Sequence, residues 1–164
     1  MSDTQMTGLS DAVRQKIDQW MTRYPAEQKR SAVLAALHYA QAENNNWLPE
    51  AAMDAVADYL DMPRIAVYEV ATFYTLFNLK PVGKHIINVC TNISCMLSGC
   101  DKIVDHLKDR LHINVNETTP DGKFTLREVE CLAACAAAPM FQIGKKYYEN
   151  LTPQKVDAIL NELE

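Results

Sequence analysis

Four of the five cysteines in this 164-residue chain form two closely spaced pairs. Four residues separate Cys90 from Cys95, three separate Cys131 from Cys135, and 35 residues lie between the pairs. Thiolates that converge on one point repel each other unless a cation neutralises them, and they are common ligands of zinc and iron–sulfur clusters. The residue type and the spacing therefore predict a metal centre.

Two kinds of metal centre fit this spacing. A [2Fe–2S] cluster takes four cysteine thiolates, and each pair can serve a different iron. A zinc site also takes four cysteines, and its usual spacing covers both pairs. Small or apolar neighbours favour the cluster, because they let backbone N–H groups approach its sulfurs; these neighbours are Leu132, Ala133, Ala134 and residues 136–138. Thiol–disulfide chemistry is disfavoured, since neither pair has the C-x-x-C spacing.

The fifth cysteine, Cys100, follows Cys95 with the same spacing of four intervening residues. The spacing alone therefore leaves open which of the two belongs to the first pair. Gly99 and Asp101 indicate that Cys100 begins a helix. We expect a small buried residue at that helix start, or a reactive thiol if the position is exposed.

Mixed strands and helices are predicted beyond a joint at residues 80–83, and these elements must position the cysteines. The expected strands are 85–89, 124–129, 140–143 and 146–149, and the expected helices run from about 98–101 to 111 and from 152 onward. Each cysteine pair follows a strand. If the first two strands are parallel neighbours, with a crossover between them, both cysteine loops meet at one edge of the sheet.

Residues 9–79 show helical periodicity almost throughout, which predicts an N-terminal bundle of four helices. The expected helices cover about 9–24, 26–43, 49–60 and 63–77, with Ser10 as an N-cap and Pro49 at a first helical position. The fold class is therefore α+β, with a helical bundle over residues 1–80 and a mixed α/β domain over residues 81–164. The apolar residues expected to face inward are Leu9, Val13, Ile17, Trp20, Tyr24, Val33, Leu34, Leu37, Ala40, Met53, Val56, Leu60, Ile65, Val67, Val70, Phe73, Leu76 and Phe77.

Composition and charge exclude several classes of protein. Apolar residues make up 48% of the chain, charged residues 23%, and the net charge is −5, which is an ordinary globular composition without the basic stripe of a nucleic-acid binder. No apolar run approaches the length that crosses a membrane. Residues 1–8 resemble neither a secretory signal nor a transit peptide, so we expect a cytoplasmic bacterial protein.

Residues for nucleotide binding and catalysis are not evident in the sequence. It has no Gly-rich phosphate loop, and none of the four histidines has a metal-like partner at helical spacing. Any nucleotide or flavin is therefore expected on a partner chain, and no catalytic residue is expected on this one.

Four separated segments resemble the thioredoxin-like [2Fe–2S] ferredoxin subunits of respiratory complex I, NADH:quinone oxidoreductase, whose bacterial form is the E subunit. The first is the cysteine region itself, residues 90–99 with residues 130–140. The others have the sequences VYEVATFY, NLKPVGK and YYENLT, at residues 67–74, 78–84 and 147–152. The resemblance covers nearly the whole chain from about Leu9.

The resemblance implies a thioredoxin-like fold for residues 81–164 and a [2Fe–2S] cluster bound by Cys90, Cys95, Cys131 and Cys135. Cys100 lies outside the family's ligand set. The chain departs from the family where Ala133 replaces a common Gly and Ala137 a frequent Asn. A Gly there would serve a left-handed backbone position, so we expect strain at Ala133 if it adopts that conformation.

Electron transfer is the function that the resemblance implies. The cluster would lie beside the FMN of a larger flavoprotein subunit that binds NADH, within the peripheral arm of complex I. That arm is at the inner face of the bacterial membrane, and this chain would neither enter the membrane nor bind nucleic acid. Two alternatives stay open: the equivalent subunit of an NAD-linked hydrogenase or formate dehydrogenase, and a zinc-stapled interaction module without redox activity.

Overall fold

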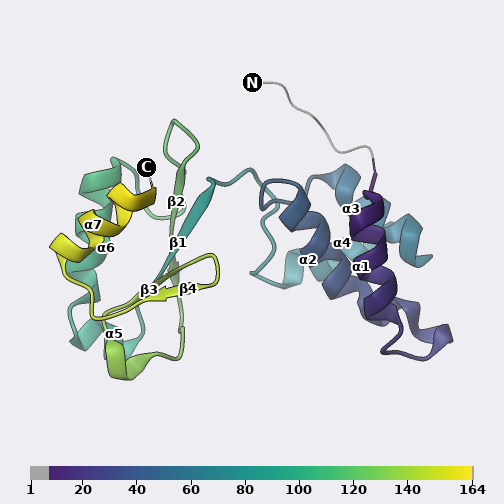
Figure 1. Cartoon of the computed structure of the whole chain (residues 1–164), viewed down its shortest axis with the longest axis horizontal. Helices are drawn as coiled ribbons and strands as arrows, with labels where there is room; N and C mark the ends of the chain where they lie inside the picture. Colours follow the sequence, from purple (N-terminus) through teal and green to yellow (C-terminus); the bar gives the residue numbers. More distant parts are fainter. Residues whose placement is uncertain (1–7, 164) are drawn as a thin grey trace. The chain divides into compact units, whose positions relative to one another are not determined.

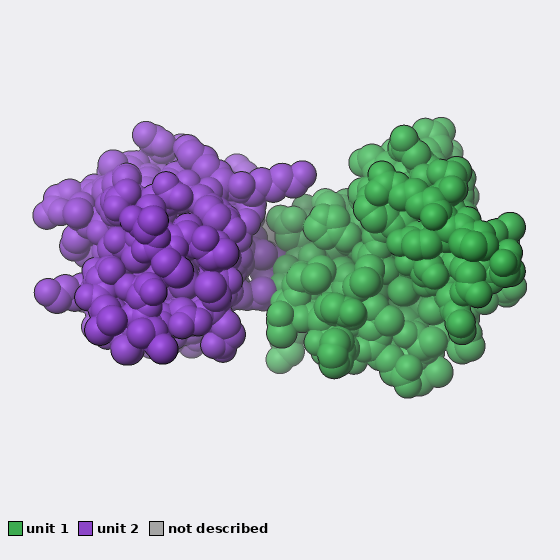
Figure 2. Space-filling view, turned by 90° about the horizontal axis from the view of Figure 1, so that it is seen from below, with its two compact units in different colours: residues 1–81 green, residues 82–164 purple. Residues whose placement is uncertain are grey.

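The computed structural model describes residues 8–163 and divides the chain into two compact units, Met1–Pro81 and Val82–Glu164 (Figures 1 and 2). The expectation that the opening residues form no signal or transit peptide falls mainly on residues 1–7, outside the described part. No helix among the described residues is long and apolar enough to cross a membrane. The two units are described separately.

The first unit consists of helices joined by short loops. They are α1 (Asp11–Met21), the 3₁₀ segment η1 (Ala26–Ala32), α2 (Val33–Glu43), α3 (Glu50–Leu60) and α4 (Arg64–Phe73). Ser10 caps α1 as predicted, since its side chain accepts a hydrogen bond from the Val13 N–H at 3.2 Å. Pro49 lies one residue before α3 rather than at its first position, where the sequence placed it.

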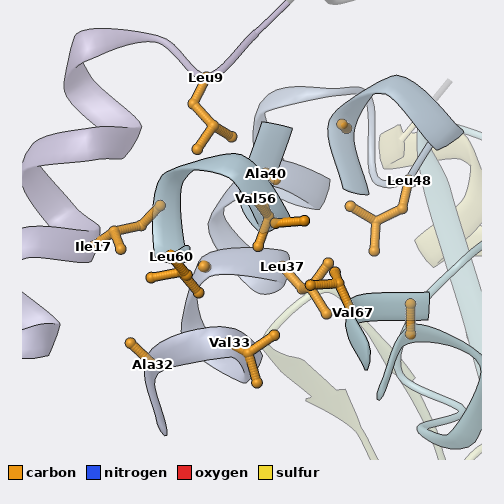
Figure 3. Close-up of a cluster of buried hydrophobic side chains, with 14 of the residues drawn as sticks. Leu9, Ile17, Ala32, Val33, Leu37, Ala40, Leu48, Val56, Leu60 and Val67 are labelled. Atoms are coloured by element: carbon orange, nitrogen blue, oxygen red, sulfur yellow. The ribbon is translucent and has the colours of Figure 1, made fainter. Parts of the chain in front are cut away.

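One apolar core holds these helices together (Figure 3). Val13 and Ile17 of α1 meet Leu37 of α2 and Val56 and Leu60 of α3 in this core. Fully burying such a side chain contributes roughly 1.5–3 kcal/mol relative to leaving it exposed. The periodic spacing thus predicted correctly the inward faces of α1 and α3, where Trp20 and Met53 pack partly buried against the core. Tyr24 also packs there, although α1 ends at Met21 rather than at the predicted residue 24.

The prediction of one continuous helix over residues 26–43 is wrong. Residues 26–32 form 3₁₀ turns, with Gln28 in a non-helical conformation at φ −109° and ψ 35°. Only Ala32 of this segment is buried, so few apolar contacts stabilise α-helical geometry there. Leu34, predicted to face inward, is exposed.

The predicted end of the fourth helix is also wrong. Helix α4 ends at Phe73 because Tyr74 adopts an extended conformation with φ −89° and ψ 117°. Val67 and Phe77 are buried and Val70 packs against the core, but three residues predicted to face inward are exposed. Their exposed fractions are 64% for Ile65, 77% for Phe73 and 51% for Leu76. Helical spacing marks an apolar face without saying whether this chain itself covers it.

The second unit is built on a four-stranded sheet in the order β2-β1-β3-β4 (Figure 1). Its strands are β1 (His85–Cys90), β2 (Phe124–Val129), β3 (Phe141–Ile143) and β4 (Lys146–Tyr148). Strand β1 runs parallel to β2 and antiparallel to β3, and β3 and β4 form the hairpin predicted from Gly144. The sequence therefore predicted all four strands to within a residue or two.

Helices α6 (Cys100–Leu111) and α7 (Pro153–Leu163) pack on this sheet. Leu107, Val156 and Leu160 join Ile87 and Leu126 in a second apolar core. Thr152 caps α7 as predicted, by accepting a hydrogen bond from the Lys155 N–H at 3.3 Å. A short helix, α5 (Ile93–Leu97), was not predicted from the sequence, since five residues are too few to show a helical period.

Gly83 fixes the start of the second unit to β2. Its N–H donates a hydrogen bond to Thr125 Oγ1 at 2.6 Å, and a Cβ at this position would lie 2.7 Å from the backbone carbonyl carbon of Phe124. Such an approach is closer than two carbon atoms can come without displacing the backbone. Only glycine therefore lets the chain lie this close to β2.

We predict that Gly83→Ala lowers the free energy of unfolding of the second unit by about 1–3 kcal/mol, the usual cost of overpacking. Urea unfolding together with hydrogen exchange of the β1 and β2 amides measures this effect. Gly8→Ala is the matched control, because a methyl group there meets nothing within 4 Å. Equal stability of the two variants would contradict the assignment.

Candidate metal centre

The pairing of β1 with β2 brings the two cysteine loops to one edge of the sheet. Cys90 is the last residue of β1 and is paired with Val129, the last residue of β2. The chain leaves both strands at this edge, where the Thr91 N–H donates to the Val129 carbonyl at 3.2 Å. Cys95 follows within α5, and Cys131 lies two residues beyond β2. The predicted convergence of the loops at one edge is confirmed.

Cys90 ends β1 and packs with Cys95 in a small apolar cluster, and the thiols of Cys95 and Cys131 both act to lower its pKa. Burial opposes its ionisation, but the backbone N–H groups of Asn92 and Leu132 and the two neighbouring thiols outweigh burial and lower its pKa. The lowered pKa favours the thiolate of Cys90, and the thiolate is the form that ligates a metal.

Cys95 has the opposite tendency in the metal-free chain. Burial raises its pKa to about 11, and its hydrogen bond to Cys90 and the Cys90 charge act in the same direction. A hydrogen bond with the Met140 backbone partly offsets the rise. A metal that binds Cys95 would displace its proton, because the thiolate is the form that ligates.

The second loop carries Cys131 and Cys135 at the surface. The Ala133 N–H donates to Cys131 Sγ at 3.3 Å, which is the close backbone approach that small side chains were predicted to permit. Cys135 opens the 3₁₀ turn η2 (Cys135–Ala137), and the Ala137 carbonyl accepts a hydrogen bond from the Asn150 N–H at 2.8 Å. The centre is thus buried on the Cys90 and Cys95 side and open on the other.

A cross-loop hydrogen bond that sequence reasoning missed ties the two loops together. Asn92 Nδ2 donates to the Glu130 carbonyl at 2.7 Å, while its Oδ1 accepts from the Ile93 N–H at 2.7 Å. Asn92 is a preferred N-cap residue, and it stands directly before α5. This residue type at a strand end is the signal that could have identified it.

Among residues 8–163, no three His, Cys, Asp or Glu side chains form a group that could hold one metal ion. A tetrahedral zinc site needs four donors around a single ion. In a [2Fe–2S] unit, four cysteines serve two irons, and each iron takes only two of them. Either centre would draw its donors from the two cysteine loops that meet at the ends of β1 and β2.

Cys100 begins α6, as predicted, and is fully buried. It packs with Cys90, Cys95 and Met140 in a small cluster beneath the cysteine loops. Its thiol donates to Asp101 Oδ1 at 3.7 Å, and burial followed by the Asp101 charge raises its pKa to about 11. The structure therefore favours the buried-residue interpretation of Cys100 over an exposed reactive thiol.

Three other polar side chains of the second unit differ in their hydrogen bonding. Ser98 Oγ donates to the Ser94 carbonyl at 2.8 Å, which is the local bonding typical of a hydroxyl near a turn. His106 Nε2 contacts Asp157 Oδ1 at 2.8 Å, linking α6 to α7. Within the described residues, His85 Nε2 is the one buried side-chain nitrogen or oxygen without a hydrogen-bond partner.

Ala133 adopts the left-handed conformation expected from the family pattern, with φ 58°. A non-glycine residue in this region costs roughly 1–2 kcal/mol, because its Cβ crowds the neighbouring backbone. The strain is retained where the Ala133 N–H meets the Cys131 sulfur. The left-handed conformation therefore places the Ala133 N–H against the Cys131 sulfur and lowers the stability of the loop.

We predict that Ala133→Gly raises the free energy of unfolding of the metal-free chain by roughly 1 kcal/mol, because the strain is removed. Ala134→Gly is the matched control: Ala134 has φ −115°, and glycine there adds only chain flexibility, which lowers stability by roughly 0.5–1 kcal/mol. Thermal unfolding compares the two variants. A loss of stability in both would show that Ala133 is not strained.

Comparison with known proteins assigns the class of this centre. Residues 17–164 match the thioredoxin-like [2Fe–2S] ferredoxin family, and the chain belongs to it. Its second unit is accordingly a thioredoxin-like domain, and the cofactor of the family is a [2Fe–2S] cluster.

The relatives come from one kind of enzyme. The E subunit of NADH-quinone oxidoreductase from Rickettsia bellii is 53% identical over 141 residues, covering 86% of this chain and 84% of the relative. The E 2 subunit of the same oxidoreductase from Rhizobium meliloti is 45% identical over 148 residues, covering 90% and 86% of the two chains. The chain is thus an electron-carrying oxidoreductase subunit, and it works with partner subunits.

A solved structure supports the fold. A chain of an NAD⁺-reducing [NiFe]-hydrogenase in its H₂-reduced state superposes with a TM-score of 0.71 at 21% identity. The match covers 80% of this chain and only 22% of the hydrogenase chain. At that identity the likeness is one of fold alone.

Proposed function

We propose that this chain is the E subunit of an NADH:quinone oxidoreductase and that Cys90, Cys95, Cys131 and Cys135 bind its [2Fe–2S] cluster. The observation that carries the ligand set is the meeting of the two cysteine loops at the ends of β1 and β2. The function is supported by relatives of 45–53% identity that are E subunits of this oxidoreductase.

Bound there, the cluster supplies a one-electron redox centre. The thiolates of the two loops hold the irons, and the Ala133 N–H near Cys131 lowers the electron density on that sulfur. Met140, Leu132 and Ala138 exclude water from the inner side of the site. Hydrogen bonds and burial are the means by which a protein sets the potential of such a cluster.

A flavoprotein subunit that binds FMN and NADH is the proposed electron partner, beside other subunits of the peripheral arm at the cytoplasmic face of the bacterial membrane. The outer face of α5 supports a docking surface next to the cysteines. Ile93, Met96 and Leu97 are exposed to 66%, 48% and 80% there, although large apolar side chains favour burial. We propose that these three residues face the flavoprotein.

The alternatives differ in the partner or in the metal. An NAD-linked hydrogenase or formate dehydrogenase would use the same chain with another catalytic subunit. The likeness in fold to a hydrogenase chain is the support for the hydrogenase alternative. The identity of the co-purifying catalytic subunit separates them. A zinc-stapled module would give a colourless protein with stoichiometric zinc and no iron.

The first experiment is anaerobic purification of the full chain from iron-replete cells, with measurement of iron, sulfide and zinc. We expect two irons and two sulfides per chain, which is the composition of one [2Fe–2S] cluster. Reduction with dithionite should give an electron paramagnetic resonance signal from a single centre. Stoichiometric zinc without iron would refute electron transfer.

We predict that Cys131→Ala abolishes the cluster, whereas Cys100→Ala retains it with two irons per chain, because Cys131 belongs to the proposed ligand set and Cys100 lies outside it. Iron content and the visible absorption spectrum measure both effects. A normal spectrum in Cys131→Ala, or its loss in Cys100→Ala, would refute the ligand assignment.

We predict that Leu97→Lys weakens binding to the flavoprotein subunit at least about tenfold, because it places a charge in a desolvated apolar contact. Cluster content serves as the internal control, since the Leu97 side chain is 80% exposed and lies outside the apolar cores of the fold. Titration of the two purified subunits measures the dissociation constant. Unchanged affinity would show that Leu97 of α5 does not contact the flavoprotein.

A further inference from the structure

Asn92 lies between the two cysteine loops, in the segment that joins β1 to α5. Its Nδ2 donates a hydrogen bond to the Glu130 carbonyl and its Oδ1 accepts one from the Ile93 N–H, each at 2.7 Å. The nitrogen and the oxygen of one amide are therefore both engaged, one on each loop. A side chain bonded in this way holds together two segments that are 38 positions apart in the sequence.

We propose that Asn92 is a positioning residue, which holds the loop of Cys131 at the distance from the loop of Cys95 that the cluster requires. This inference rests on the proposed function, because it concerns the proposed ligands of the cluster. Without the bond, the two loops separate more often and the cluster loses iron sooner. Asn92 itself is exposed and lies outside the proposed ligand set, so it acts through the cysteines.

The nitrogen of the amide acts on the peptide that leads into Cys131. The Glu130 carbonyl and the Cys131 N–H belong to one planar unit, and they point in opposite directions because peptide bonds before residues other than proline are trans. A carbonyl that is fixed on Asn92 Nδ2 therefore also fixes the direction of the Cys131 N–H. The loop thus starts in one orientation at the residue that carries a proposed ligand sulfur.

The oxygen of the amide acts on the helix that carries Cys95. Asn92 directly precedes α5, and its Oδ1 pairs with the N–H of the first helical residue, Ile93. A helix of five residues is too short to be stable by itself in water. Cys95 is the third residue of α5, so the side chain that holds the Glu130 carbonyl also fixes the start of the helix that places Cys95.

Other backbone hydrogen bonds hold the two loops at their outer ends. The Thr91 N–H donates to the Val129 carbonyl at 3.2 Å, directly at the strand ends. The Asn150 N–H donates to the Ala137 carbonyl at 2.8 Å, beyond the second cysteine pair. Neither bond reaches the stretch between them, where the Asn92 amide meets the second loop. Loss of that amide therefore loosens the loops next to the cysteines while the sheet stays paired.

Asn92→Ser separates the two contacts of the side chain, because serine caps a helix about as well as asparagine but has no amide nitrogen to reach Glu130. We expect the loaded variant to lose iron to an excess of an iron chelator, without oxygen, about threefold to tenfold faster than wild type, which is the effect of one hydrogen bond. The electron paramagnetic resonance spectrum of the reduced cluster should also shift, since the Cys131 sulfur would be held in a different position.

Ser10→Ala is the matched control, because it removes a helix cap from α1 in the first unit. It should leave both the rate of iron loss and the spectrum unchanged. A wild-type rate and spectrum in Asn92→Ser would overturn the proposal, since capping alone would then account for Asn92. Equally faster iron loss in Ser10→Ala would overturn it too, because a general loss of stability would explain the effect. A wild-type chain that binds no iron would instead refute the proposed function.

Should Asn92→Ser not fold, the comparison moves to Asn92→Asp, which keeps the shape and the cap of the side chain but replaces its donor with an oxygen. Iron loss is then measured in about 1 M salt, where the Debye length is about 3 Å and the added charge is largely screened. Faster loss than from wild type in the same salt is expected. Equal rates would overturn the proposal.

Discussion

The parallel pairing of β1 with β2 is the constraint on which the metal centre depends. Ile87, Val89 and Leu126 are fully buried, so a slip of one residue in either strand would turn core side chains toward the opposite face. The core therefore fixes the register that places Cys90 opposite Val129. Because the strands are parallel, the two loops that carry the cysteines leave the sheet at the same edge.

Hydrogen bonds to backbone carbonyls help to hold the loops beyond that edge. The Asn92 amide joins one loop to the Glu130 carbonyl of the other, and the N–H groups of Asn150 and Leu151 donate to the carbonyls of Ala137 and Pro139 at 2.8 and 3.0 Å. Loops built in this way leave backbone N–H groups free to face sulfur. The resulting site is closed behind Cys90 and Cys95 and open at Cys131 and Cys135, which suits exchange of electrons with a docked partner.

The first unit shows where periodicity stops being informative. The same apolar spacing that marks the buried Val67 also marks Ile65 and Phe73, which are exposed. A helical face that packs within its own chain and one that meets another subunit have the same composition. The spacing marks an apolar face, and only the structure shows which of its residues this chain itself covers.

The sequence by itself determined the cysteine pairs, the four strands, the caps at Ser10 and Thr152, and the resemblance to the ferredoxin family. These signals are local, because turn residues, alternation and metal-ligand spacing act within a few neighbouring positions. Only the tertiary structure decided that Cys100 packs against Cys90 and Cys95, that Asn92 bridges the loops, and that Ala133 is left-handed. Those features depend on how the chain packs around the two cysteine loops once β1 and β2 pair, and short-range sequence signals do not specify that packing.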